Sequence, residues 1–297
     1  MNIVVLVEKI GKTTHDLLRA AEPLGVALTP ARWSDLSAEA SNDGERITAG
    51  GVALHEADAV LLRTMSAAAF EQVFLRLDVL HRLEALGVRV VNPPRAVEIS
   101  CDKHLSLAIL RAAGLNTPRT FACQRYVDAM GAFDALGGDV VVKPLFGAEG
   151  FGVMRITDRV LAQRAFNQLE RTGAVAYIQQ FIPHGDTDLR LFVIGDEVAA
   201  AMRRHGADWR CNIALGGRGE SIVPEPELRA LALRAARACR ALIAGVDIVL
   251  AEDGTPFALE VNAIPGWKAL AEVTGIDIAA AVLQFTAQIT AKNSIHA

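Results

Sequence analysis

The strongest constraint on the fold is an alternation of short apolar runs with longer amphipathic segments along the first third of the 297-residue chain. Runs of β-branched and aliphatic residues predict strands, and the segments between them carry apolar residues at helical spacing. The expected strands are Asn2–Val7, Ala57–Arg63 and Val88–Asn92, and the expected helices are His15–Leu24 and Phe70–Leu86. Strands that alternate with helices favour a parallel sheet. We therefore expect a Rossmann-like α/β domain over residues 1–95.

This domain lacks the glycine pattern of dinucleotide-binding proteins. No G-x-G-x-x-G follows its first expected strand, so nothing there places a pyrophosphate at a helix N-terminus. We therefore assign no dinucleotide to it. The segment Ser37–Gly51 is polar and contains glycine, which predicts a loop or a short hairpin.

The order of elements changes after Pro94. A helix over Asp102–Ala113 is predicted to end at Gly114, with Pro118 soon after, which is a typical helix stop. Further strands are expected at Val140–Lys143, Val153–Ile156, Tyr177–Ile182, Asp188–Ile194, Glu197–Met202, Val246–Ala251 and Pro256–Val261, and further helices at Leu161–Arg171, Leu228–Ile243 and Ile276–Ala291. The last two strands should pair as a hairpin around Asp253-Gly254.

Composition argues against several classes of protein. A net charge of −4 and a pI near 6.0 leave no electrostatic footprint for nucleic acid. No apolar run reaches the roughly 20 residues that cross a bilayer, and the N-terminus lacks the basic leader of a signal peptide. We therefore expect a cytoplasmic protein that binds neither nucleic acid nor membrane. The cysteines are scattered without a CxxC pair and are expected to be reduced and buried, at Cys101, Cys123, Cys211 and Cys239.

A glycine-rich loop and two lysines form the first candidate site. Gly147, Gly150 and Gly152 lie between two expected strands, where such a loop can fold over phosphates and offer its backbone N–H groups. An ordinary hairpin turn is the alternative. Lys143 ends the apolar strand before this loop, and burying a lysine is costly without an anionic partner such as a nucleotide phosphate. Lys103 is a second candidate, although either lysine could be a solvated surface charge.

Acidic residues near the C-terminus form the second candidate site. Glu260 and Asn262 lie two residues apart in an expected strand, so they project from the same face. Asp247 lies in the partner strand of the expected hairpin and can join them. Three hard oxygen donors suit Mg²⁺, which shares its coordination shell with waters and substrate phosphates. The alternative is that these groups cap turns or pair with arginines, but charges within apolar strands are costly without a partner.

A series of short motifs in chain order carries a family resemblance. They are Asp102-Lys103, Val142-Lys143-Pro144 with the glycine loop, Gln179-Gln180-Phe181-Ile182, Asp188-Leu189-Arg190, Arg210-Cys211-Asn212, Gly245-Val246-Asp247 and Leu259-Glu260-Val261-Asn262-Ala263-Ile264-Pro265-Gly266. This set closely resembles the ATP-grasp ligases, and within them the RimK-type α-L-glutamate ligases and their amino-acid-ligase relatives. The resemblance covers about Pro93 to Asp277. It implies an ATP-grasp fold, in which two α+β lobes clamp ATP: a linker helix and small lobe over 96–182, and a large lobe over 183–297.

The resemblance also implies roles for individual residues. The residues implied to bind ATP are Lys103, Lys143, Gly147, Gly150, Gly152, Gln180, Phe181, Ile182 and Asp188, with the backbone of 180–182 on adenine and Asp188 on the ribose. The residues implied to hold two Mg²⁺ ions, for which Mn²⁺ can substitute, are Asp247, Glu260 and Asn262. The residues implied to act near the transferred phosphate are Arg190, Arg204 and Asn212. Arg190 could instead be a strand-face charge, and Arg204 part of a solvated basic cluster with Arg203 and His205. Either Arg203 or Arg204 could be the residue near the phosphate, and we prefer Arg204.

The implied activity is ATP-dependent ligation of a carboxylate to an amine through an acyl phosphate. Two departures bear on the substrates. Leu215 stands where relatives carry an arginine before a Gly-Gly pair, and Ile264-Pro265-Gly266-Trp267 differs from the usual sequence of ribosomal-protein modifiers. Trp267 could stack on a flat ring or pack in the core. Arg210, Gly266 and Trp267 are the candidate substrate residues, and the Pro-Gly-Trp form favours relatives that add glutamate to tetrahydromethanopterin-like cofactors.

Three functions stay open from the sequence. The first is a ligase that adds L-glutamate to a small-molecule or cofactor carboxylate. The second is a RimK-type ligase that adds glutamate to a protein C-terminus, and the third is a nucleotide-binding module without catalysis. The resemblance also implies a homo-oligomer, either a dimer or a tetramer. The identity of the acceptor and the number of residues added do not follow from the sequence.

Overall fold

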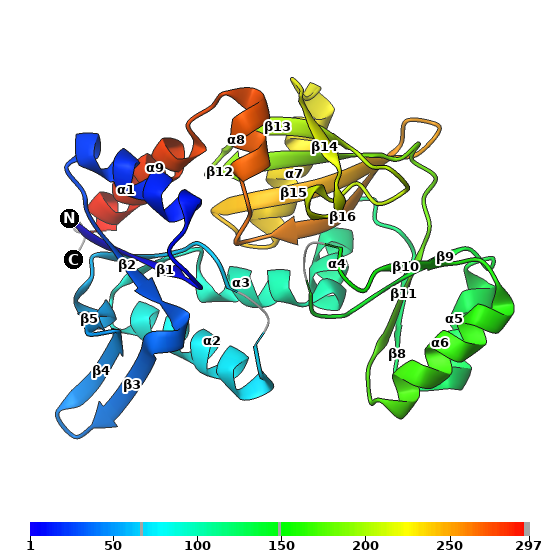
Figure 1. Ribbon diagram of the computed structural model, residues 1–297, viewed down its shortest axis with the longest axis horizontal. Helices are drawn as coiled ribbons and strands as arrows, with labels where there is room; N and C mark the ends of the chain where they lie inside the picture. Colours follow the sequence, from blue (N-terminus) through cyan, green and yellow to red (C-terminus); the bar gives the residue numbers. More distant parts are fainter. Residues whose placement is uncertain (66–67, 148–149, 294–297) are drawn as a thin grey trace.

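The N-terminal part is built on a parallel sheet, as the alternation of strands and helices predicts. A computed structural model describes residues 1–65, 68–147 and 150–293 (Figure 1). The first strands are β1 (Asn2–Val7), β2 (Ala27–Arg32), β6 (Ala59–Leu62) and β7 (Arg89–Val91), and the helices are α1 (Lys12–Leu24) and α2 (Phe70–Ala85). They form a four-stranded sheet in the order β2-β1-β6-β7, in which all neighbours are parallel. β2 was not predicted because it contains Pro30, which an edge strand tolerates.

The polar segment over residues 37–51 forms a hairpin, one of its two predicted forms. It contains β3 (Leu36–Ser41) and β4 (Gly44–Ala49), and β4 also pairs with the short β5 (Val52–Ala53). Short 3₁₀ turns flank these strands at Trp33–Asp35 and Leu54–Glu56. Trp33, Ile47 and Leu54 are buried against one face of the parallel sheet, so the hairpin is part of that core.

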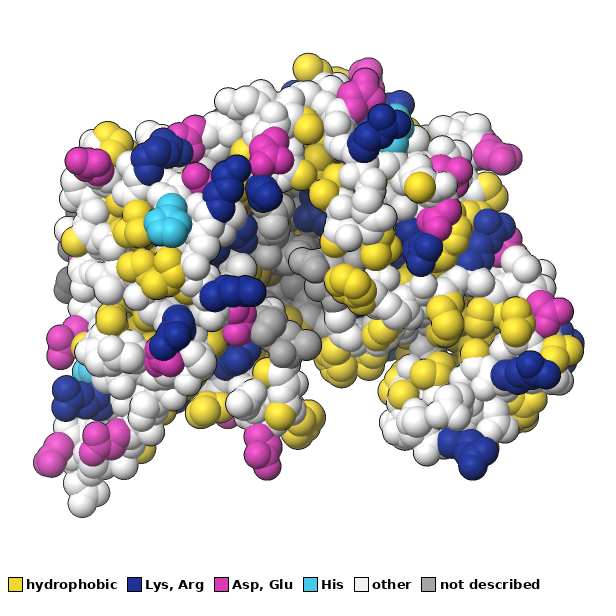
Figure 2. Space-filling model, in the orientation of Figure 1, with side chains coloured by type: hydrophobic (Ala, Val, Ile, Leu, Met, Phe, Trp, Pro, Cys, Tyr) yellow, Lys and Arg dark blue, Asp and Glu magenta, His cyan; other side chains and the backbone are white. Residues whose placement is uncertain are grey.

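A second, antiparallel sheet carries the lysine and the glycine loop. Its strands are β8 (Thr120–Cys123), β9 (Val140–Lys143), β10 (Met154–Ile156) and β11 (Ala176–Gln180), in the order β10-β9-β11-β8. The helices of this region are α3 (Pro94–Cys101), α4 (Lys103–Ala112), α5 (Tyr126–Ala135) and α6 (Arg159–Arg171). α5 and α6 bury Phe133 and Phe166 on one face of the sheet. The surface is hollowed between this part and the rest of the molecule (Figure 2).

The third sheet holds the acidic residues. Its strands are β12 (Thr187–Ile194), β13 (Glu197–His205), β14 (Arg218–Ser221), β15 (Ile243–Leu250) and β16 (Pro256–Asn262), in the antiparallel order β14-β13-β12-β15-β16. The predicted hairpin of the last two strands is confirmed. The helices are α7 (Pro226–Ala238), α8 (Lys268–Thr274) and α9 (Ile278–Asn293), and a 3₁₀ turn covers Ile213–Leu215. The prediction that α7 extends to Ile243 is wrong, because Arg240 adopts a left-handed conformation and Ile243 already begins β15.

The last helix returns to the first sheet. α9 lies beside α1, and the end of α9 is on the same side of the molecule as the start of β1 (Figure 1). Ile278, Val282 and Leu283 pack in one core with Ile3 and Val5 of β1. The same core includes Phe192 and Trp267, so it joins the first and third sheets. Within the described residues no single helix is long and apolar enough to span a membrane; α8 and α9 pass that test only as a pair, and they bend by 113° at their junction.

Asn92 ties the first sheet to the third. It follows β7, is 2% exposed, and its side-chain amide donates to the carbonyl oxygens of Ile243, at 2.6 Å, and Ala263. Its Oδ1 accepts from the backbone N–H groups of Leu242, at 2.6 Å, and Ile243, at 2.9 Å. These backbone groups belong to the start of β15 and the residue after β16. One buried side chain therefore satisfies backbone groups of both strands at the open end of the hairpin that carries the acidic residues.

Replacing Asn92 with alanine should strongly destabilise the protein. Four hydrogen bonds would be lost, and each buried backbone group left unsatisfied costs about 1–3 kcal/mol. We expect Asn92→Ala to lower the free energy of unfolding by about 3 kcal/mol or more in urea titrations. Asn167→Ala, at an exposed position of α6, should change it by less than about 0.5 kcal/mol. Equal effects of the two substitutions would contradict the assigned role.

Candidate active site

Asp247 and Glu260 face each other across two neighbouring strands. In the register of β15 and β16, Asp247 is paired with Glu260, and Gly245 with Asn262. Residues directly opposite in an antiparallel pair share a face of the sheet, and Asn262 lies two residues beyond Glu260. The pairing shifts after Asp247, since Ile248 is opposite Ala258, so Leu259 is the extra residue of a bulge. The structure thus brings together the three oxygen donors that the sequence grouped.

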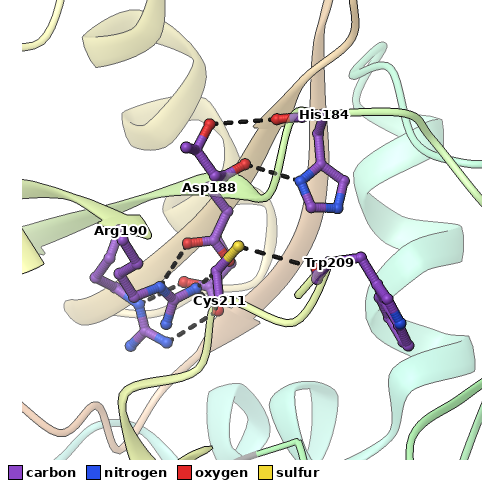
Figure 3. Close-up of polar contacts among 8 residues, drawn as sticks. His184, Asp188, Arg190, Trp209 and Cys211 are labelled. Carbon is purple, nitrogen blue, oxygen red and sulfur yellow. Dashed lines mark hydrogen bonds and ion pairs between the residues drawn. The ribbon is translucent and has the colours of Figure 1, made fainter. Parts of the chain in front are cut away.

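Two arginines hold Asp247 and Asp188 in a buried ion network (Figure 3). Arg190 donates through Nε and Nη2 to both carboxylate oxygens of Asp247. Arg204 donates to both oxygens of Asp188, at 2.6 and 2.7 Å, and its Nη2 lies 3.0 Å from Asp247 Oδ2. The strand register explains the network, because Asp188 is opposite Arg204 and Arg190 is opposite Asp247. Cys211 lies beside this network (Figure 3).

The burial of this network shifts the pKa values of its carboxyl groups in opposite directions. Burial raises the pKa of Asp188, and this outweighs the attraction of Arg204. Burial also opposes ionisation of Asp247, but Arg190 and Arg204 together lower its pKa below the usual value. Asp247 is therefore held as a carboxylate by two cations. A buried carboxylate with two guanidinium partners can remain ionised where an isolated one could not.

Arg204, rather than Arg203, faces the site. Arg204 is 4% exposed, whereas Arg203 on the same strand points to solvent. The alternative that Arg204 belongs to a solvated basic cluster is therefore wrong. The alternative that Arg190 is only a strand-face charge is also excluded, since its bidentate contact fixes it on Asp247.

Glu260 is a half-buried carboxylate with no hydrogen-bond or ion-pair partner among the described residues. Lys143 lies close enough for its attraction to Glu260 to raise the lysine's pKa, although burial is the larger cause and lowers it to about 8. Such a carboxylate is available to a cation. With Asp247 and the amide oxygen of Asn262 on the same face, the donor set has the hard oxygen chemistry that Mg²⁺ prefers. The set includes only two carboxylates, and no cluster of three or more His, Cys, Asp or Glu side chains that could hold a metal ion is found in the described part of the chain.

The two lysines reach toward the glycine loop from different elements. Lys143 Nζ donates to Gln179 Oε1 at 2.7 Å, and Lys103 Nζ donates to the carbonyl oxygen of Gly147 at 2.6 Å. Ala148 and Glu149 of the predicted loop lie outside the described residues. Gly150 has a φ of +78°, and a Cβ there would lie 2.5 Å from Asn212 Oδ1, so only glycine permits this approach. The structure therefore brings Asn212 to the loop.

The predicted hinge, residues 180–182, lies at the end of β11 in the second sheet. β11 ends at Gln180, two residues before the predicted end of the strand. The backbone N–H of Gln180 donates to Arg119 O at 2.8 Å, and that of Phe181 to Asp139 O at 3.3 Å. Ile182 has no such backbone bond among the described residues. Of the three hinge residues, Ile182 thus offers a free N–H.

The candidate substrate residues do not gather on one open surface. Trp267 is 4% exposed; its ring packs edge-on against Phe192, with centroids 6.1 Å apart, and the guanidinium of Arg63 covers it at 3.8 Å. The idea that Trp267 stacks on an acceptor is corrected by this burial: it is a core residue. Arg210 is paired with Asp208 at 2.6 Å beside Trp209, and Gly266 is exposed.

Sequence reasoning missed Arg63. It directly follows an apolar strand, the same signal that singled out Lys143, and it lies against the loop that follows β16. In both cases, a charged residue at the end of a buried strand indicates that its side chain has an unusual partner.

The chain is similar to known ligases. Residues 100–286 match the RimK-like ATP-grasp domain. The tetrahydromethanopterin:alpha-L-glutamate ligase of Methanosarcina acetivorans is 31% identical over 283 residues, which cover 86% of this chain and 87% of that protein. A probable alpha-L-glutamate ligase of Picosynechococcus sp. is 32% identical over 239 residues, covering 79% and 78%. The solved ATP-grasp ligase PsnB, complexed with a phosphomimetic variant of minimal precursor, Mg and ADP, superposes with a TM-score of 0.73 and 24% identity over 96% of this chain and 97% of that one.

Removing the shared arginine should destabilise the fold as well as the site. Arg204→Met would leave Asp188 and part of Asp247 buried without a cation, and breaking one partner of a buried ion pair costs about 3–5 kcal/mol. We expect a loss of that size in denaturant unfolding. Arg203→Met removes the same charge from the exposed face of the strand, and a loss there of more than about 1 kcal/mol would show that the effect is not due to the network.

Proposed function

The chain belongs to the RimK-like ATP-grasp family, and from that premise we propose that it adds L-glutamate to the carboxylate of a small molecule or cofactor. As a family member it has the ATP-grasp fold and is an ATP-dependent carbon–nitrogen ligase that uses divalent metal ions. The observation that carries the proposal is the row of Asp247, Glu260 and Asn262 on one strand face, beside two arginines and Lys143. Phosphoryl transfer depends mainly on such positioning and charge neutralisation.

In this proposal ATP lies between the second and third sheets. Lys103, Lys143 and the glycine loop contact its phosphates, since these groups already converge. The free N–H of Ile182 is the hinge group that binds adenine. Asp188 holds the ribose while it remains paired with Arg204, because each carboxylate oxygen has two lone pairs and can accept a further hydrogen bond.

Asp247, Glu260 and Asn262 hold the divalent ions in this proposal. We propose two Mg²⁺ ions, with Glu260 shared between them, and Mn²⁺ as a substitute. When bound, such ions neutralise charge on the phosphate oxygens during transfer. Arg190 and Arg204 keep Asp247 ionised and fixed in direction, so this ligand is ready without rearrangement of the strands.

The proposed reaction has two steps. The acceptor carboxylate attacks the γ-phosphate of ATP, which yields ADP and an acyl phosphate. The amine of L-glutamate then attacks the acyl carbon and releases phosphate. Arg190, Arg204 and Asn212 lie near the transferred phosphate in this scheme. Because Asn212 contacts the glycine loop at Gly150, closure of the loop would cover the acyl phosphate and exclude water.

The acceptor that we propose is a pterin-like carrier of one-carbon units. The name of the Methanosarcina relative supports this choice, and the region of similarity covers most of both chains. The second candidate is addition of glutamate to a protein C-terminus, as RimK-type enzymes do. The two differ in the acceptor alone, so a screen of acceptors separates them.

An ADP-release assay tests the proposed function. We expect ADP release only when L-glutamate and a carboxylate acceptor are present together, with the ligated product identified by mass spectrometry. Glu260→Gln should reduce the rate by about a hundredfold or more, since metal stabilisation of the transferred phosphate supplies several kcal/mol. Glu252→Gln, at an exposed position of the turn between β15 and β16, is the matched control and should retain activity. A Glu260→Gln variant with near wild-type turnover would refute the metal assignment.

Nucleotide binding should depend on the protonation of Lys143. Its pKa of about 8 means that Lys143 loses its charge, and with it its attraction for phosphate, as the pH rises through that value. We expect the affinity of the free protein for ATP to fall about tenfold between pH 7 and pH 9, measured by titration calorimetry. Lys143→Arg stays charged over this range and should show a much weaker dependence. The same pH dependence in both proteins would exclude Lys143 as its source.

A further inference from the structure

Arg63 is a buried cation without an acidic partner in the part of the chain that the structure describes. It follows β6, is 5% exposed, and makes one hydrogen bond to a described residue, from Nη1 to Pro265 O at 3.2 Å. Its guanidinium stacks on Trp267 at 3.8 Å, and its Nε is buried without any hydrogen-bond partner. No carboxylate among the described residues forms an ion pair with it. Burial alone lowers the pKa of Arg63, to about 10, so no described charge compensates for it.

Such a residue destabilises the fold. A buried charge without a partner costs several kcal/mol, and an apolar side chain of similar length would pack on Trp267 without that cost. Glu8, the acid that follows the neighbouring strand β1, is engaged by Arg76 at 2.9 Å. The charge of Arg63 therefore points to an anion that is not part of the described chain.

The position of Arg63 connects it to the reaction centre. It lies at the carboxyl edge of the parallel strands β1 and β6, where ligands of open α/β sheets bind. Its partner Pro265 also lies close to Arg190: a Cβ placed on Gly245 would be 3.0 Å from Pro265 Cβ and 2.4 Å from Arg190 Nη1. Pro265 therefore lies between Arg63 and Arg190, the arginine that is paired with Asp247.

Charged groups of both signs line a cavity beside Trp267. This cavity of about 250 Å³ is lined by Lys12 and Lys268, which begin α1 and α8, and also by the acidic residues Asp16, Glu272 and Asp277. Lys12 contacts Glu272 at 3.3 Å, whereas Lys268 is exposed and has no ion-pair partner within the described ranges. Basic side chains gather on this face between α1, α8 and the middle of the molecule (Figure 2). Arg19 is paired with Asp277 at 2.8 Å, so Lys268 is the lining cation that remains available to attract an anionic substrate toward Arg63.

We propose that Arg63 binds a carboxylate of the substrate that does not itself react, at the junction of the first sheet and the loop 264–268. The proposal rests on the function proposed above and specifies its substrate site. That carboxylate belongs either to the incoming L-glutamate, which keeps two carboxylates through the reaction, or to the acceptor. A guanidinium that is already desolvated and stacked loses little entropy on binding, so it can select for a carboxylate over an amide.

Steady-state kinetics of Arg63→Met test this site. Methionine keeps the apolar contact with Trp267 but removes the charge. We expect the KM of one carboxylate substrate to rise by about tenfold to hundredfold while the KM of ATP stays within about twofold, because a hydrogen bond to a charged group contributes about 1.5–3 kcal/mol. Varying L-glutamate at fixed acceptor, and then the reverse, identifies which substrate carries the carboxylate. Arg63→Lys should restore part of the affinity for that carboxylate substrate. A purely structural role of Arg63 would not predict this recovery.

The control is Arg89→Met. Arg89 begins β7 in the same sheet and also has a buried Nε without a partner, but it lies at the amino edge. This variant should leave every KM unchanged. If Arg63→Met leaves the KM of both carboxylate substrates unchanged, or raises all three KM values together with a fall in Tm like that of a packing defect, the proposal is overturned.

A binding assay separates this proposal from the failure of the proposed function. Thermal denaturation with ADP and Mg²⁺ present, with and without L-glutamate or the acceptor, requires no turnover. The substrate that Arg63 binds should raise the Tm of the wild-type protein and of Arg89→Met, but not that of Arg63→Met. If the wild-type protein releases no ADP with any substrate pair, the proposed function fails. An equal thermal shift in Arg63→Met and wild type would overturn the role of Arg63 whether or not turnover is observed.

Discussion

The antiparallel pairing of β15 with β12 on one side and with β16 on the other is the constraint on which the candidate site depends. It sets Asp247 opposite Arg190 in one direction and opposite Glu260 in the other. A shift of one residue in either pairing would turn one of these side chains to the opposite face. Asn92 limits such a shift by binding backbone groups at the start of β15 and just after β16. Backbone register, rather than loop conformation, therefore positions the chemistry.

The proposed metal site places two opposed demands on its carboxylates. A carboxylate within a buried strand needs cations to remain ionised, and a metal ligand needs an oxygen that a metal can reach. Arg190 and Arg204 meet the first demand, and Arg204 also serves Asp188. Glu260, half-buried and unpaired within the described chain, meets the second. The division explains why neighbouring carboxylates on one face have such different surroundings.

Much of the fold and part of the site could be predicted because their signals are local. β1 and β9 have the predicted ends, since buried strands give continuous apolar runs, and the spacing of Glu260 and Asn262 defines a shared face. The end of α7 could not be predicted, because the apolar residues after it belong equally well to a helix or a strand. The roles of Asn92, Arg63 and Trp267 depend on partners far along the chain: Arg63 and Pro265 are separated by 202 residues. No local pattern encodes such contacts.

The return of α9 to the first sheet has a consequence for how the protein is made. One face of β1 and its neighbours is covered by side chains of residues 278–283, which the ribosome adds long after β1. Until then, Ile3 and Val5 lack the apolar partners that bury them in the finished chain. The N-terminal parallel sheet is thus synthesised well before the helix that completes its core. A nascent chain must therefore keep this apolar sheet face protected until α9 has been added.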